Sequence, residues 1–225
     1  MKPNYIQQRA VGESTILQQS FAWMFVGLLL TAGSAVFAAS NMPFRQALRD
    51  NSILFIGLII VELVLVFAIS ASVTSLAAPV AMLLFAAYAL INGLTLSVIF
   101  FVYASGSIAA AFVSSALIFG IMACFGYATK KDLSGVGSIA FMALIGLIIA
   151  SLVNMFLHSA SMGYLLSYGA VIIFTALTAY DTQKLKMLSS TMGGGNLGIY
   201  GALTLYLDFI NIFLALLRIF GRQRN

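Results

Sequence analysis

Residues 21–40 read FAWMFVGLLLTAGSAVFAAS, a run of 20 residues with no charged side chain. A helix needs about 20 apolar residues to cross the hydrocarbon core of a bilayer, so this run can span it. Similar runs recur along the chain of 225 residues, of which 62% are hydrophobic and only 8% are charged. A soluble domain carries about 25% charged residues, so the 8% found here are too few to cover a surface that faces water. The sequence predicts an all-α polytopic membrane protein.

Hydropathy divides the chain into seven predicted transmembrane helices joined by short polar segments. No stretch remains for a separate soluble domain. We therefore expect a cytoplasmic N-terminal tail at 1–19, one membrane domain over 20–221 and a basic C-terminal tail at 222–225. The seven spans are predicted near 20–40, 53–73, 77–103, 107–129, 137–157, 163–187 and 197–220.

The 11 basic residues lie at the ends of the apolar runs. There they orient a membrane protein and do not form a patch that would bind nucleic acid. With the N-terminus inside, seven crossings place six of these 11 residues inside, whereas a re-entrant last segment would place nine there. The charge bias favours re-entry, but the 24 residues of 197–220 contain no proline and favour a crossing. We expect seven crossings, and re-entry remains the alternative.

One predicted packing seam lies in the fourth span. Ala116, Gly120, Cys124 and Ala128 recur every four residues, which aligns small side chains on one helix face. Small residues let helices approach closely in lipid. We therefore expect this face, including Cys124, to be buried against another helix.

Three acidic residues fall inside predicted spans, at Glu62, Asp181 and Asp208. An Asp at the centre of a span costs about 2.5–3.5 kcal/mol on insertion scales, so each residue indicates a function or a polar partner. No Lys or Arg occurs in the second or third span to neutralise Glu62.

Polar side chains recur at helical spacing in four spans, and we expect these stripes to converge on an interior cavity. The stripes are Tyr88, Asn92 and Thr95; Ser151, Asn154 and His158; Thr175, Thr178 and Asp181; and Thr204, Asp208 and Asn211. The predicted pore-lining residues are Glu62, Asn92, Asn154, Asn211, Thr178 and Thr204.

The last two spans are joined by a short Gly-rich loop, so they are antiparallel neighbours. Asp181 and Asp208 can meet if the sixth span continues as helix past Lys186. Two adjacent carboxyl groups in a low dielectric cannot both ionise easily, and they can share a proton. Deprotonated, the same pair offers oxygen ligands to calcium, although two carboxylates make only a weak site.

Three segments of the chain are distinctive, namely GLTLS at 93–97, ALTAYDTQKLK at 176–186 and GALTLYLDFINIFLALLRIFG at 201–221. They resemble the Bax inhibitor-1 family, also called the transmembrane Bax inhibitor motif family, in its bacterial inner-membrane branch. The similarity extends over essentially the whole chain and includes KKDLSG after the fourth span.

The resemblance implies six helices around a central C-terminal helix and a pH-sensitive calcium leak. It implies that Asp181 and Asp208 are the pH sensor and that Glu62 is the acidic residue of the second helix. Since spans two to five hold no basic residue beside this pair, a shared proton is favoured over a salt bridge. Calcium would be the transported ion, with no cofactor and no enzymatic activity, in a bacterial inner membrane.

Two other functions are weighed against this one. The first is a non-transporting regulator of membrane-protein quality control, which would bind a membrane protease through residues 1–19. The second is an intramembrane aspartyl protease of the presenilin type, whose outline fits Tyr180, Asp181 and Asp208. That family needs Gly-x-Gly-Asp, but Asp208 follows LYL, and its Pro-Ala-Leu segment is missing as well. The protease is therefore disfavoured.

Overall fold

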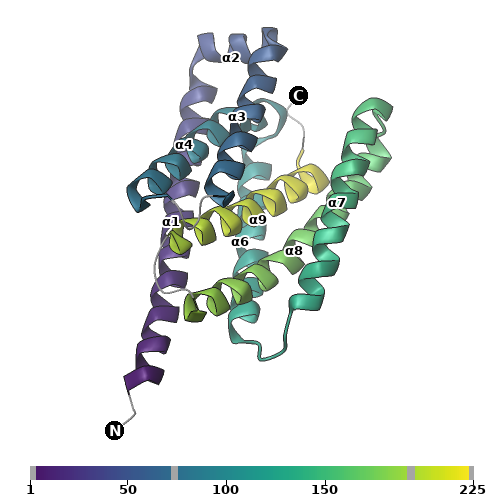
Figure 1. The fold of residues 1–225 in the computed structure, drawn as a ribbon. Helices are drawn as coiled ribbons and strands as arrows, with labels where there is room; N and C mark the ends of the chain where they lie inside the picture. The colour runs from purple at the N-terminus through teal and green to yellow at the C-terminus, as the bar shows by residue number, and fades with distance from the viewer. Residues whose placement is uncertain (1–3, 72–75, 192–195, 223–225) are drawn as a thin grey trace. The chain divides into compact units, whose positions relative to one another are not determined.

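Helices account for all regular secondary structure in the residues that the computed structural model describes, which are 4–71, 76–191 and 196–222 (Figure 1). The predicted all-α class is confirmed. The helices are α1 (Asn4–Ser40), α2 (Met42–Asp50), α3 (Ser52–Ala71), α4 (Ala78–Leu96), α5 (Ile99–Val102), α6 (Ser105–Ala128), α7 (Ser134–Leu157), α8 (Ala160–Thr191) and α9 (Leu197–Phe220).

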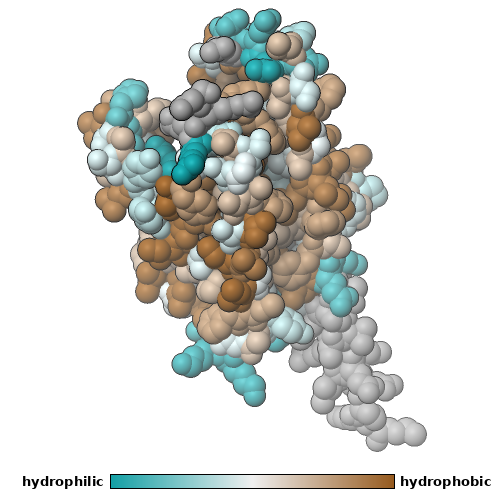
Figure 2. Space-filling model, turned by 180° about the vertical axis from the view of Figure 1, so that it is seen from behind, coloured by the Kyte–Doolittle hydropathy of each residue, from teal (hydrophilic) through white to brown (hydrophobic). Residues whose placement is uncertain are grey.

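Seven described stretches are long and apolar enough to cross a membrane, which confirms the predicted number of spans. The third span consists of two helices, because α4 ends at Leu96 and α5 starts at Ile99. Many large apolar side chains are exposed, as expected where lipid surrounds a protein, and they dominate the face drawn in Figure 2. α9 differs from the rest, since 61% of its most apolar window is buried, against 6–44% in the others.

The chain forms two compact units. The first comprises Met1–Val102 and Met187–Tyr206, and the second comprises Tyr103–Lys186 and Leu207–Asn225. The first unit therefore holds α1 to α5, the last turn of α8 and the first part of α9, while the second holds α6, α7, most of α8 and the rest of α9. Both predicted aspartates belong to the second unit.

Helix starts in the first unit follow from local sequence. Asn41 precedes α2, and its Oδ1 accepts a hydrogen bond from Phe44 N at 3.1 Å. Asn51 precedes α3 and accepts from Ile53 N and Leu54 N. An Asn at this position satisfies N–H groups that have no partner inside the helix. Pro43 and Pro79 lie in first turns, where the missing N–H costs nothing.

Glycines set the helix spacing in the second unit. A Cβ added to Gly126 of α6 would collide with the backbone of Ala179 on α8. A Cβ at Gly137 of α7 would come within 2.5–2.6 Å of the Tyr180 ring. α8 is thus held closely by α6 and α7 at the two residues that precede Asp181.

The predicted small-residue seam of α6 is wrong. Ala116, Cys124 and Ala128 are exposed, and a Cβ at Gly120 would meet no atom within 4 Å. The buried face lies one residue earlier and carries Ala111, Ser115, Phe119, Ala123 and Gly126. Phe119 shows the physical reason, because an aromatic ring fills more interhelical space than a methyl group and packs edge-to-face on Phe209 at 5.8 Å.

The first testable prediction compares two glycines of α6. Gly126→Ala should lower the free energy of unfolding by about 1–3 kcal/mol, because the methyl group meets backbone that cannot rotate away. Gly120→Ala, in open space on the same helix, should leave stability unchanged or slightly higher, since Ala favours helix over Gly. Thermal or denaturant unfolding of the purified protein in detergent measures both. Equal effects of the two substitutions would contradict the close approach.

Candidate functional site

Two carboxyl groups meet in the second unit, one from α8 and one from α9. The side chains of Asp181 and Asp208 lie within hydrogen-bonding reach of each other. Asp208 is only 3% exposed, and its Oδ2 has no hydrogen-bond partner among the described residues. α8 continues as helix to Thr191, well past Lys186, which is what the sequence required for the two residues to meet.

A cation of α8 itself acts on this pair. The ammonium group of Lys184, one turn after Asp181, acts electrostatically on the Asp181 carboxyl group. Lys184 Nζ also lies 5.8 Å from the centre of the Tyr180 ring. Asp181 thus has a neighbouring positive charge, whereas the acidic group acting on Asp208 is Asp181. The two carboxyl groups are in contact but not equivalent.

A side-chain clamp holds the α6–α7 connection onto α8 two residues after Asp181. Gln183 Oε1 accepts from Leu133 N, and Gln183 Nε2 donates to Lys131 O, each at 2.8 Å. Lys186 Nζ donates to Tyr127 O at 2.9 Å. In the same connection the pKa of Asp132 lies below its usual value, because the Ser134 hydroxyl and N–H donate to its carboxylate. The KKDLSG segment is therefore fixed to the helix that carries Asp181.

Several predicted lining residues use their side chains on their own helix. Thr178 Oγ1 donates to Phe174 O at 2.7 Å, and Thr204 Oγ1 donates to Tyr200 O at 3.0 Å. Asn211 Nδ2 donates to Leu207 O at 2.8 Å. Each bond reaches back one turn and leaves the side-chain oxygen able to accept a hydrogen bond. Their role in lining a pore remains a prediction.

Asn154 and His158 lie at the end of α7. His158 has a φ of 51°, in the left-handed region, and its N–H donates to Asn154 O at 2.8 Å. Asn154 Oδ1 accepts from Ser159 N at 3.2 Å, so the side chain stabilises the turn into α8. This hydrogen bond explains why an Asn is found at position 154. Its role in lining a pore remains a prediction.

A polar network in the first unit surrounds Glu62 of α3. Thr95 Oγ1 donates to Glu62 Oε1 at 2.7 Å, and Asn92 Nδ2 donates to Glu62 Oε2 at 3.2 Å. The Tyr206 hydroxyl donates to Asn92 Oδ1 at 2.9 Å and lies 2.6 Å from Thr31 Oγ1. Glu62 is thus held by neutral donors, and the network reaches α9 and α1.

The sequence identified part of this network. Asn92 and Glu62 are predicted site residues, and Thr95 belongs to the predicted polar stripe on the same helix. Tyr206 and Thr31 were missed, because a tyrosine or threonine in an apolar run is ordinary in a span. The available signal was that a buried Tyr hydroxyl needs a hydrogen-bond partner, which directs attention to polar residues of other helices.

Comparisons with known proteins identify relatives over nearly the whole chain. The family described as "Inhibitor of apoptosis-promoting Bax1" matches residues 13–225. The inner membrane protein YbhL of Escherichia coli K12 is 51% identical, with 97% of this chain and 96% of the relative covered. An uncharacterized protein of Borreliella burgdorferi is 40% identical and covers 97% of both chains. An uncharacterized membrane protein of Streptococcus pyogenes serotype M3 is 40% identical, with 92% and 94% covered.

These relatives and the seven spans together confirm the predicted localisation, a bacterial inner membrane that the chain crosses several times. The predicted resemblance is confirmed as well, since both the match and the 51% identity extend over the whole membrane domain.

The second testable prediction concerns the Tyr206 hydroxyl. Tyr206→Phe should lower the free energy of unfolding by about 1–3 kcal/mol, because buried polar groups of Asn92 and Thr31 lose a partner. Tyr200→Phe is the matched control on the same helix, since no described residue bonds to its hydroxyl. Unfolding of both variants in detergent provides the measurement. An equally large loss of stability in Tyr200→Phe would show that the hydrogen bonds of the Tyr206 hydroxyl add nothing beyond the effect of removing any tyrosine hydroxyl from α9.

Proposed function

The chain belongs to the Bax inhibitor-1 family, and we propose that it is a pH-sensitive calcium leak channel gated by Asp181 and Asp208. The single observation that supports this most is the contact between the two carboxyl groups inside membrane-spanning helices. The proposal includes no enzymatic step.

The gate follows from the electrostatics of two carboxyl groups in a low dielectric. With one proton between them, one group donates to the other and the contact is favourable. Without that proton, two negative charges lie side by side and repel strongly, because little water screens them. The proton count of the pair therefore biases α8 and α9 between a joined and a separated arrangement. Two packings that differ by a few kcal/mol respond fully to such a change.

The pair also provides the cation site of the proposed channel. Carboxylate oxygens are ligands that calcium prefers, but tight sites use six to eight oxygens. The described residues contain no group of three or more His, Cys, Asp or Glu that could hold a metal ion. A site of two carboxylates suits an ion in transit, since a leak needs binding strong enough for entry and weak enough for release. Thr178 and Thr204 would add polar oxygens near the pair.

Glu62, Asn92 and Asn211 have different places in this mechanism. Asn211 follows Asp208 by one turn of α9 and continues its polar face. Glu62 and Asn92 form the hydrogen-bonded network of the first unit, which would position α9 through Tyr206. Asn154 would act by fixing the turn between α7 and α8.

The third testable prediction is the pH dependence of calcium entry. Native protein in liposomes should change its calcium flux between about pH 6 and about pH 8, as the shared proton is lost. Asp208→Asn, which cannot lose a proton, should give a flux that is flat over this range. Asp50→Asn is the control, because it removes an exposed acidic group at the end of α2 and should keep the native profile.

Each alternative outcome has a definite meaning. A native flux equal to that of empty liposomes at every pH, from protein with native helical content, overturns the channel. The regulator that binds a membrane protease through residues 1–19 would then be the next candidate. A flux that retains its native pH profile in Asp208→Asn leaves the channel standing but overturns the aspartate gate.

A further inference from the structure

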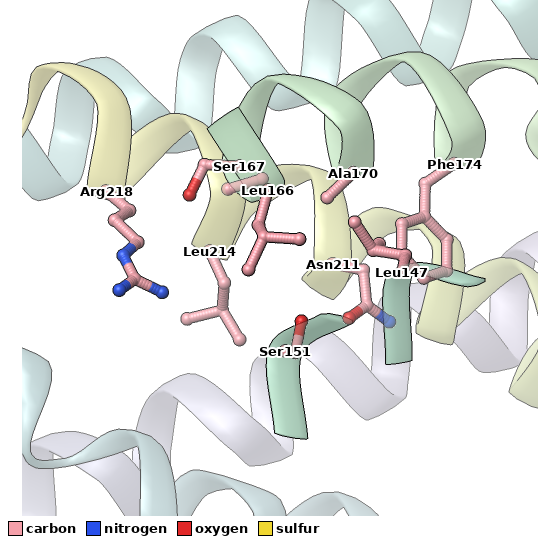
Figure 3. Close-up of a pocket in the computed structure, with 10 residues that line it drawn as sticks. Leu147, Ser151, Leu166, Ser167, Ala170, Phe174, Asn211, Leu214 and Arg218 are labelled. Carbon is pink, nitrogen blue, oxygen red and sulfur yellow. The ribbon is translucent and has the colours of Figure 1, made fainter. Parts of the chain in front are cut away.

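A pocket of about 220 Å³ lies in the second unit between α7, α8 and α9 (Figure 3). Its walls are mostly apolar and include Leu147, Leu166 and Leu214. The Asn211 amide lies towards one end, and the Arg218 side chain extends at the other. The volume falls below the roughly 300–1,000 Å³ of pockets that enclose a whole small molecule. The pocket can therefore hold only part of a larger ligand.

Arg218 brings the only full charge into this pocket. Its lining contains no Asp, Glu or Lys, and no acidic side chain in the described part of the chain pairs with the guanidinium group. The guanidinium group packs over Gly163 of α8, where an added Cβ would lie 2.5 Å from Nη2. The missing side chain at Gly163 gives the guanidinium group its place beside α8. A positive group held in this way attracts an anion.

The position of Arg218 along the span narrows the class of ligand. It lies in the last turn of α9, where a membrane-spanning helix reaches the level of the lipid headgroups. Exposed apolar side chains flank the pocket on α7 and α8, among them Ile148 and Leu165, so its rim faces lipid. A ligand that reaches this pocket from the membrane and binds Arg218 combines an anionic headgroup with an apolar chain.

We propose that this pocket is a binding site for an anionic glycerophospholipid, with its phosphate on Arg218 and part of one acyl chain along Leu147, Leu166 and Leu214. The planar guanidinium group matches a phosphate with two parallel hydrogen bonds. The Ser151 hydroxyl, which is exposed at the pocket, and Asn211 Oδ1 are polar groups available to the glycerol region. This site does not depend on calcium transport by the protein.

Native mass spectrometry tests the site without any measurement of flux. The purified full chain is mixed in detergent with equal amounts of phosphatidylglycerol and phosphatidylcholine, and the retained lipids are counted. The native protein should retain phosphatidylglycerol in preference. Arg218→Gln should reduce that retention by about tenfold or more, as the loss of a charge-assisted hydrogen bond implies.

Two further variants separate the pocket from general charge and from misfolding. Arg222→Gln removes the same charge outside the pocket, and it should retain lipid as the native protein does. Within the part of the chain that the structure describes, Arg222 forms its hydrogen bonds through its backbone, with Ala104 and Ser107. Leu214→Trp keeps Arg218 but fills the pocket, and it should also reduce retention. Equal retention of the two lipids by native protein would overturn the site. So would an equal loss in Arg218→Gln and Arg222→Gln, or full retention by folded Leu214→Trp.

Discussion

The packing of the second unit keeps the carboxyl groups of Asp181 and Asp208 in contact. A carboxyl group as buried as Asp208 cannot remain charged inside a span without a partner, and the partner present is a second carboxyl group. Such a contact tolerates little movement, because a hydrogen bond between oxygens weakens within a few tenths of an ångström. The close approaches at Gly126 and Gly137, and the Gln183 clamp, all fix α8 within a few residues of Asp181. The tightest packing of α8 therefore lies beside the contact between the two aspartates.

The chain keeps its third intramembrane carboxyl group by a different means. Glu62 receives a hydroxyl and an amide donor, and the amide is itself oriented by the Tyr206 hydroxyl. Neutral donors lower the cost of a buried carboxyl group without adding a charge that must itself be desolvated. The two arrangements have different consequences. The aspartate pair changes its net charge with one proton, whereas Glu62 sits in a satisfied network that holds α1, α3, α4 and α9 in register.

The sequence predicted the features that depend on one helix or on two helices joined by a short loop, and it missed the contacts between helices that are distant in the sequence. Apolar runs fix the spans, because each helix must match the bilayer by itself. The meeting of Asp181 and Asp208 was also predictable, since a short loop makes the last two helices neighbours. The α6 seam failed because spacing shows that Ala116, Gly120 and Cys124 share a face but not which face is buried. The Arg218–Gly163 contact gave no signal, as it joins residues 55 positions apart through an absent side chain.

Arg218 and Asp208 both lie on α9, but they are too far apart to neutralise each other even when Asp208 is ionised. They are ten residues apart, which at the rise of an α-helix places their backbones roughly 15 Å from each other. At that separation their attraction is about 1 kcal/mol at an effective dielectric near ~20, against about 4 kcal/mol for a pair in contact. Neither charge therefore neutralises the other. Asp208 depends on a carboxyl group that can share a proton, and Arg218 depends on an anion from outside the chain. One helix thus carries both the aspartate of the proposed gate and the arginine of the proposed lipid site.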